Sequence, residues 1–237
     1  MLTAVQIITS LGVVAGLVFT GLGLSQTAAS VEESRKAQRI AQDELDLSRL
    51  GQANERFVKA VEQLSSNKIE ARLGGIYALE KAIKDSPEYH VTVLDVLVAY
   101  VPEHDNGVPK GNPDVFERAP SDVQAALTVL RRNPVISGGV TKPLTVHWPD
   151  VRLPAADLSG VNMSNANLAD AYLNGADLEG ANLNGVNLSG EAHLSSANLN
   201  GVDLREAEMS DADLSTSSLV GADLREASLS GVNLSIA

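Results

Sequence analysis

The chain has 237 residues, a formal net charge of −12 and no cysteine. Without cysteine it has no disulfide framework, no thiolate metal site and no cysteine nucleophile. The acidic balance and the few aromatic residues (three Phe, one Trp and four Tyr) argue against nucleic-acid binding through phosphate contacts or base stacking.

The N-terminal segment is apolar and carries no charge. No charged side chain occurs from Met1 to Val31, and residues 2–24 are mostly Leu, Val, Ile, Gly and Ala. About twenty helical residues span roughly 30 Å, the thickness of a bilayer core. We therefore expect a transmembrane anchor over residues 1–27. The basic residues just beyond it are Arg35, Lys36 and Arg39. By the positive-inside rule they predict a single-pass protein of the cell membrane with the bulk of the chain in the cytoplasm.

Two other interpretations of this segment stay open. A cleaved signal peptide would need a basic start and a small-x-small cleavage site, to which Thr27-Ala28-Ala29 is a weak match. The segment could also be a buried core helix. Gly12 and Gly16 have the G-x-x-x-G spacing that lets two membrane helices approach closely, and they are predicted as helix-packing residues.

A helical linker is expected at residues 28–50 and an α-helical module at 51–134. The expected helices are 30–66, Ile69–Lys84, His90–Val101 and Ser121–Arg132. In the last of these, Ser121 suits the N-cap position and Asp122 suits the first turn. A second linker is expected at 135–145.

The long polar helix carries an interrupted heptad stripe. Its apolar a and d positions are Ile40, Leu47, Leu50, Phe57, Val61 and Leu64. Asp43 falls on a d position and Asn54 on an a position, so the pattern is a weak coiled-coil signal. Packing against the helices that follow explains the second half of the stripe equally well.

Residues 146–237 repeat with a period of five. The central residue of each unit is Leu or Met, the residue two positions earlier is small, and the residue between them is polar. The central residues are Leu153, Leu158, Met163, Leu168, Leu173, Leu178, Leu183, Leu188, Leu194, Leu199, Leu204, Met209, Leu214, Leu219, Leu224, Leu229 and Leu234. This period fits neither a helix nor a long strand, but it fits a chain that turns a corner every five residues. Pairs such as Ser159-Gly160 suit those corners, because glycine tolerates positive φ.

The A-[D/N]-L-x-x pattern resembles the pentapeptide-repeat family, whose fold is a right-handed, four-sided β-helix. The resemblance implies four to five coils, with residues 146–148 as a degenerate first unit and Glu191 as an insertion that makes a corner bulge. Residues 56–80 also resemble a helical segment of membrane-anchored bacterial members of the family. The predicted fold class is thus an N-terminal transmembrane helix, a small all-α module and an all-β right-handed quadrilateral β-helix.

The residue pattern contains no convincing catalytic constellation. The four histidines are scattered without metal-site spacing, and no glycine-rich segment has the Walker pattern. Ser65-Ser66-Asn67-Lys68 matches S-x-x-K, a pattern short enough to arise by chance. We therefore predict no enzyme activity, no metal and no cofactor.

The predicted function follows from the charge of the repeat. Residues 151–237 hold twelve carboxylates against three arginines, a net charge of −9. This predicts a membrane-tethered, non-catalytic scaffold that presents an acidic β-helix to an unidentified cytoplasmic protein partner, with no direct nucleic-acid binding. The alternative, implied by the family resemblance, is a DNA mimic that regulates a DNA-binding protein such as gyrase. An unrecognised enzyme is the third hypothesis.

We expect other parts of the chain to pack over the first coil of the repeat but not over the last coil. Helix Ser121–Arg132 and residues 134–143 can cover the first coil. No helix or charged tail follows the last coil, where Leu224, Leu229, Leu234 and Ile236 are predicted as contacts of a homodimer joined end to end. A frayed last coil shielded by Ile236 is the alternative.

Overall fold

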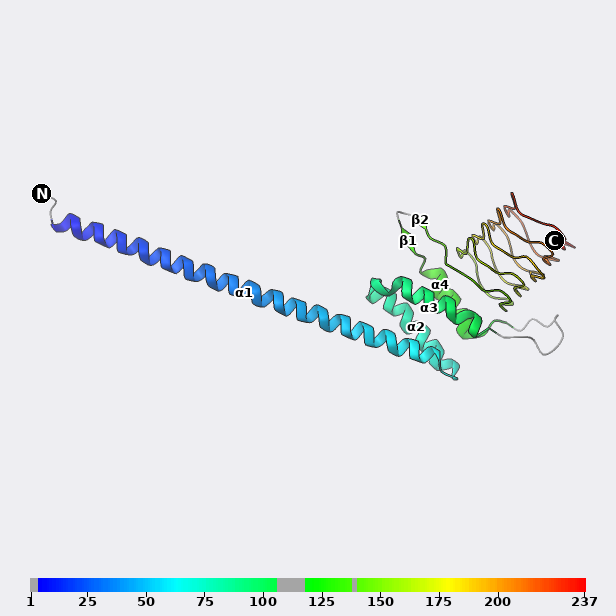
Figure 1. Ribbon diagram of the computed structural model, residues 1–237, viewed down its shortest axis with the longest axis horizontal. Coiled ribbons are helices and arrows are strands. Elements are labelled where there is room, and N and C mark those ends of the chain that lie inside the picture. The colour runs from blue at the N-terminus through cyan, green and yellow to red at the C-terminus, as the bar shows by residue number, and fades with distance from the viewer. Residues whose placement is uncertain (1–3, 106–117, 138–139) are drawn as a thin grey trace. The chain divides into compact units, whose positions relative to one another are not determined.

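The computed structural model describes the backbone of residues 4–105, 118–137 and 140–237, and side chains at 30–105, 118–135 and 142–237. The described chain divides into two units, Met1–Asn54 and Glu55–Ala237. Figure 1 shows the helices and the stacked coils of the repeat.

Helix α1 (Ala4–Leu64) is one continuous helix of 61 residues. Among the described residues, no helix combines the length and the apolar character that crossing a bilayer requires. The predicted transmembrane anchor over residues 1–27 is therefore wrong, as is the assignment to the cell membrane as a single-pass protein. The apolar sequence does not form an element of its own, because it continues without a break into the polar residues of the same helix.

The helical part is also larger than the small module we expected. It comprises the end of α1, then α2 (Ile69–Asp85), the 3₁₀ turn η1 (Pro87–Tyr89), α3 (His90–Glu103) and α4 (Ser121–Arg132). Its core contains Ile76, Leu79, Leu97 and Leu130, each at most 1% exposed. A short antiparallel hairpin of β1 (Ile136–Ser137) and β2 (Val140–Thr141) follows α4.

A buried ion pair joins α2 to α4 near the start of α4, which begins at Ser121 as expected but with a different N-cap. Pro120 occupies the N-cap position without a side-chain cap, so Ser121 is the first helical residue and not the cap. Asp122 is fully buried and accepts a hydrogen bond from Arg72 Nε at 2.6 Å and another from the Tyr100 hydroxyl. Burial opposes ionisation, but the hydrogen bonds from Arg72 and Tyr100 outweigh it and hold the pKa of Asp122 below its ordinary value.

The repeat forms coils of four five-residue sides. Each polar residue between the two inward positions pairs in parallel with the residue one coil later, as Asp157 does with Asp177, 20 residues further on. The amide of Leu153 donates forward to the Tyr172 carbonyl, and the amide of Tyr172 donates back to the Val151 carbonyl. These bonds between coils satisfy the backbone, while small residues and leucines fill the interior.

Every complete corner of the repeat uses one left-handed residue. Eight glycines have positive φ there, including Gly180 at +63°. Ten corners place another residue in this region, among them Ala155 at φ 51° and Thr216 at φ 59°. Because L-residues other than Asn and Asp are strained in this conformation, the stacked coils hold corners such as those at Ala155 and Thr216 against a local preference.

The insertion at Glu191 alters one corner only. Pairs that span it are 21 residues apart, as in Tyr172 with His193, whereas later pairs such as His193 with Asp213 return to 20. Asp170 Oδ1 accepts a hydrogen bond from the Glu191 amide at 2.9 Å. The extra residue is therefore tied to the previous coil while the interior columns stay in phase.

Helices α3 and α4 cover the first coil. Trp148 is only 2% exposed, and its Nε1 donates to the Val98 carbonyl of α3 at 2.8 Å. Gln124 of α4 donates to the Asp157 carbonyl and accepts from the Asp157 amide. These contacts satisfy a side of the first coil that has no preceding coil, and the helices and the repeat share one hydrophobic core.

Candidate functional site

The outward side chains of the repeat form four columns, one on each side of the coil. Each column holds the polar residues that pair from coil to coil. The columns are His147, Asn167, Asn187, Glu208 and Ser228; Arg152, Tyr172, His193, Asp213 and Asn233; Asp157, Asp177, Asn198 and Ser218; and Asn162, Asn182, Asp203 and Asp223. Neighbours within a column are about 4.8 Å apart, the spacing of paired strands. The surface is therefore a fixed lattice of side chains whose order is set by the sequence.

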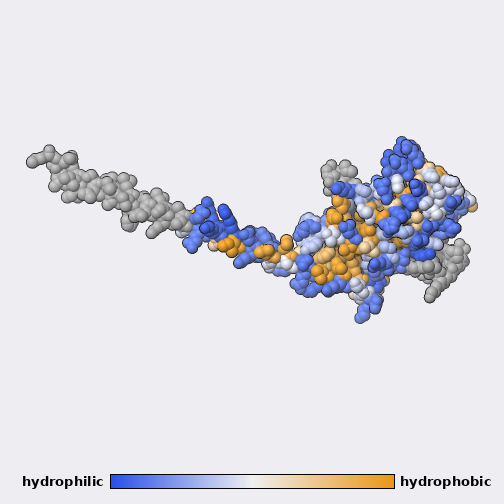
Figure 2. Space-filling view, in the orientation of Figure 1, coloured by the Kyte–Doolittle hydropathy of each residue, from blue (hydrophilic) through white to orange (hydrophobic). Residues whose placement is uncertain are grey.

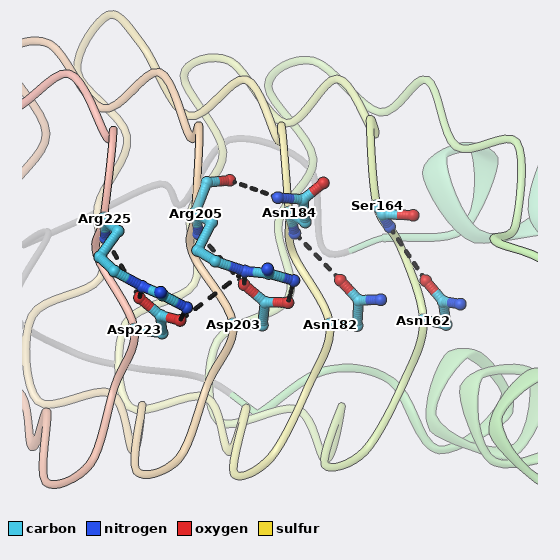
Figure 3. A network of polar contacts seen from close by, with 8 residues as sticks. All are labelled: Asn162, Ser164, Asn182, Asn184, Asp203, Arg205, Asp223 and Arg225. Carbon is cyan, nitrogen blue, oxygen red and sulfur yellow. Dashed lines mark hydrogen bonds and ion pairs between the residues drawn. The ribbon is translucent and has the colours of Figure 1, made fainter.

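One side carries an arginine–aspartate ladder (Figure 3). Arg205 donates to both carboxylate oxygens of Asp203, at 2.8 and 2.7 Å, and Arg225 does the same to Asp223, at 2.8 and 2.6 Å. Arg205 also lies 3.7 Å from Asp223 in the next coil. The hydrogen bond from Arg225 lowers the pKa of Asp223 to about 2. These charges are largely compensated on their own side of the coil.

The second column stacks a cation on two rings. The Arg152 guanidinium lies 3.7 Å from the centre of the Tyr172 ring, and the ring of His193 in the next coil lies 4.5 Å from that of Tyr172. His193 is half-buried, as are most outward residues of the repeat.

An acidic edge runs along the corner between the first and second columns. We define it as Asp170, Glu191, Glu208, Asp211 and Asp213, which follow one another over three successive coils. Glu191, Glu208 and Asp211 are exposed, and Asp170 and Asp213 are half-buried. Within the described residues no Lys, Arg or His pairs with any of the five. Twelve carboxylates lie in residues 151–237 and, in the described chain, only Asp157, Asp203 and Asp223 form ion pairs, so five of the nine others lie on this edge.

The sequence-predicted site residues fall in two places. Gly12 and Gly16 lie among residues whose side chains are outside the described part of the structure. In the last coil, Leu224 is partly buried, whereas Leu229, Leu234 and Ile236 are 40%, 46% and 89% exposed. Sequence reasoning missed the acidic edge, which could have been found by aligning residues 20 apart before the insertion and 21 apart across it.

The remaining chemical candidates serve local structure. His104 stacks on Tyr100 with ring centres 4.0 Å apart, and a ring nitrogen of His90 lies 2.9 Å from the Asn133 carbonyl oxygen. In the S-x-x-K segment, Ser66 Oγ accepts a hydrogen bond from the Lys68 amide. In the part of the chain that the structure describes, no three His, Asp or Glu side chains gather as a metal site would require.

Comparison with known proteins matches the repeat alone. Residues 153–190, 191–215 and 207–235 match the family described as Pentapeptide repeats, in eight copies. No curated protein matches the chain.

Three solved structures of pentapeptide-repeat proteins illustrate the similarity. Rfr23 from the cyanobacterium Cyanothece 51142 is 30% identical over 39% of this chain and 63% of its own, with a TM-score of 0.37. HetL from the cyanobacterium Nostoc sp. strain PCC 7120, involved in regulating heterocyst differentiation, is 32% identical over 37% of this chain and 46% of its own, with a TM-score of 0.20. QnrB1, a plasmid-mediated fluoroquinolone resistance protein, is 20% identical over 39% of this chain and 45% of its own, with a TM-score of 0.38.

The chain thus covers less than two thirds of the length of each of these proteins. The five-residue period and the matched family profile agree on residues 153–235, so this segment consists of pentapeptide repeats.

Proposed function

We propose that this protein is a non-catalytic scaffold whose β-helix binds a basic protein partner through the acidic edge. The main observation behind this proposal is that five carboxylates along one corner lack a cationic partner, whereas Asp203 and Asp223 on another side form ion pairs with arginines. Two features of the repeat support a non-catalytic role. Its inward positions are apolar, and its outward positions form regular columns.

The edge suits charge-based recognition because its backbone is fixed. A single exposed ion pair contributes about 0–1 kcal/mol, so affinity would need several contacts made together. Carboxylates held at successive coils, about 4.8 Å apart, can meet a run of Lys or Arg side chains without reordering the scaffold. Such an interface should associate quickly and weaken with salt.

Two triple variants with equal charge change test this proposal. The edge variant combines Glu191→Gln, Glu208→Gln and Asp213→Asn. The control carries the changes Glu179→Gln, Glu206→Gln and Glu226→Gln, which lie on other sides of the repeat.

Each full-length chain is used to capture proteins from a cell extract, and the captured proteins are quantified. We expect basic proteins that the unaltered chain and the control retain to be lost from the edge variant. Equal capture by the edge variant and the control would refute the role of the edge.

The acidic edge also favours a second candidate, a DNA mimic that regulates a DNA-binding protein such as gyrase. A supercoiling assay separates the two. A mimic should inhibit gyrase, and the edge variant should lose this effect while the control keeps it. Supercoiling that is unaffected by the unaltered chain would remove this candidate and leave the scaffold proposal standing.

We also propose that the last coil associates with the last coil of a second copy. Leu229, Leu234 and Ile236 expose apolar surface there, and burying such surface stabilises association by roughly 25 cal/mol per Å². Sedimentation of the full chain should show self-association that Leu234→Glu weakens. If Leu234→Glu sediments as the unaltered chain does, the last coil is not the contact.

A further inference from the structure

The heptad stripe of α1 packs against other residues of the chain in its second half and is exposed in its first half. Toward its end, the stripe packs within the chain: Leu64 is 6% exposed, and Phe57 stacks on Tyr89 with ring centres 5.0 Å apart. The same helical face contributes Val61, which packs against the core partly buried. This half of the stripe is therefore an established packing interface.

Upstream of Asn54, no described residue of the same unit packs against the stripe. Ile40, Leu47 and Leu50 occupy the a, a and d positions and are 59%, 71% and 59% exposed. Every residue from Ser30 to Gln52 is exposed, and residues up to Asn54 form a separate unit. Figure 2 shows apolar patches among hydrophilic ones along this part of α1. A long helix with leucines at heptad spacing gains stability mainly by packing that face against a partner.

The charges beside the stripe favour a second copy of this helix as the partner. In a parallel two-stranded coiled coil, the g residue of one helix faces the e residue five positions later on the other. In the register set by Ile40, Arg39 is at g and Glu44 is at e. Each Arg39 would therefore face the Glu44 of the other copy, and a symmetric pair would contain two such contacts. Neither residue makes an ion pair within the described chain.

We propose that two copies of this chain pair in parallel through residues 37–54 of α1, forming a short two-stranded coiled coil. Asn54 at an a position favours the aligned register, since a buried Asn prefers to meet its counterpart. Asp43 at a d position opposes pairing, because two carboxylates would face each other. With two heptads and this fault, the pairing is reversible and depends on protein concentration.

The absence of cysteine makes a register-specific test available, because one substitution creates a single thiol per chain. Leu50→Cys places the thiol at d, facing its counterpart. The control Gln52→Cys places it at f, on the outer face of the same helical turn.

Both substitutions are made in a full chain that carries Leu234→Glu, so that association through the last coil is suppressed. Oxidation at low protein concentration is carried out with and without a non-ionic detergent, which separates pairing from non-specific clustering of the apolar N-terminal sequence. We expect Leu50→Cys to yield a disulfide-linked dimer at least severalfold faster than Gln52→Cys. Equal rates, or no dimer from either, would overturn the proposal.

Charge exchange across the pair supplies a second measurement that leaves the apolar stripe intact. Arg39→Glu and Glu44→Arg should each weaken dimerisation severalfold in sedimentation, because each sets like charges against each other between the helices. The double exchange should restore it, because the pair is rebuilt with opposite polarity. A double variant no stronger than the single ones would refute the parallel register, since Arg39 and Glu44 are five residues apart and do not face each other within one helix.

Discussion

Leucines in one interior column should differ in their contribution to stability according to their coil. Leu173 and Leu234 occupy equivalent positions three coils apart, yet Leu173 is 0% exposed and Leu234 is 46% exposed. Replacing either by alanine removes three carbon atoms. The comparison therefore isolates the effect of having a coil on both sides rather than on one.

The expected magnitudes follow from the exposed fractions. For Leu173→Ala, the lost transfer free energy of about 2.4 kcal/mol is joined by a cavity contribution, giving a total of about 3–5 kcal/mol. For Leu234→Ala, about half of the transfer free energy is lost and no closed cavity forms, so about 1.3 kcal/mol is expected. Because coils interact only with their neighbours, part of the smaller loss should appear as local fraying.

Chemical unfolding of the full chain measures both effects. The chain has a single tryptophan, Trp148, which is buried in the first coil, so its fluorescence reports on the front of the repeat. Circular dichroism reports on the whole backbone. Leu173→Ala should shift both signals, and Leu234→Ala should shift the Trp148 signal little.

Equal losses of free energy in the two variants would refute the reasoning. A loss for Leu234→Ala that grows with protein concentration would show that a second copy covers the last coil.

Three further results are expected from single sites. Gly180→Ala should destabilise the repeat by about 1–2 kcal/mol in chemical unfolding, because its φ of +63° disfavours a side chain although the space around the added carbon is open. In the opposite direction, Ala155→Gly, at φ 51°, should stabilise the repeat by a few tenths to about 1 kcal/mol. Asp122→Ala should cost about 3–5 kcal/mol by the same measurement, because it leaves the mostly buried Arg72 unpaired. The pKa of Asp122 is lower in the folded state than in the unfolded state. The stabilisation from its ionised form is therefore present above the unfolded-state pKa and is lost as the pH falls through the folded-state pKa. Thermal stability should drop in acid, and this part of the drop should be absent in Asp122→Ala.

The repeat could be predicted from sequence because its interactions recur with a fixed period. The inward positions are fixed by a five-residue rule, and the structure buries Ala176 and Leu178 completely, as the rule requires. The starts of α2, α3 and α4 were also predicted, since apolar spacing and the breaks between the helices mark them.

What could not be predicted depends on contacts between distant residues. Asp122 was expected to be a favourable charge in a first turn, but the ion pair with Arg72, 50 residues away, buries it. Asp177 occupies an outward position of the five-residue unit, and its Oδ1 accepts hydrogen bonds from the Glu179 amide and from Asn198 Nδ2 in the next coil. The contacts of Asp122 with Arg72 and of Asp177 with Asn198 have no signal in a local window, since they join residues 50 and 21 positions apart.

The predicted membrane anchor failed for a related reason. A window of apolar residues predicts a spanning helix from composition alone. In the structure this apolar segment belongs to a helix of 61 residues, and most of the side chains described in that helix are polar and exposed.

The insertion at Glu191 shows how sequence spacing becomes surface chemistry in this fold. A spacing of 20 residues would place Ala192 over Tyr172, whereas the observed spacing of 21 places His193 there, and the two rings stack. The same shift keeps Leu194 in the column of Leu173, so the interior is unchanged while Glu191 is added to the acidic edge. One extra residue at a corner therefore alters the outward lattice without disturbing the core. For this reason the binding properties of the repeat should be inferred from columns across coils rather than from runs along the chain.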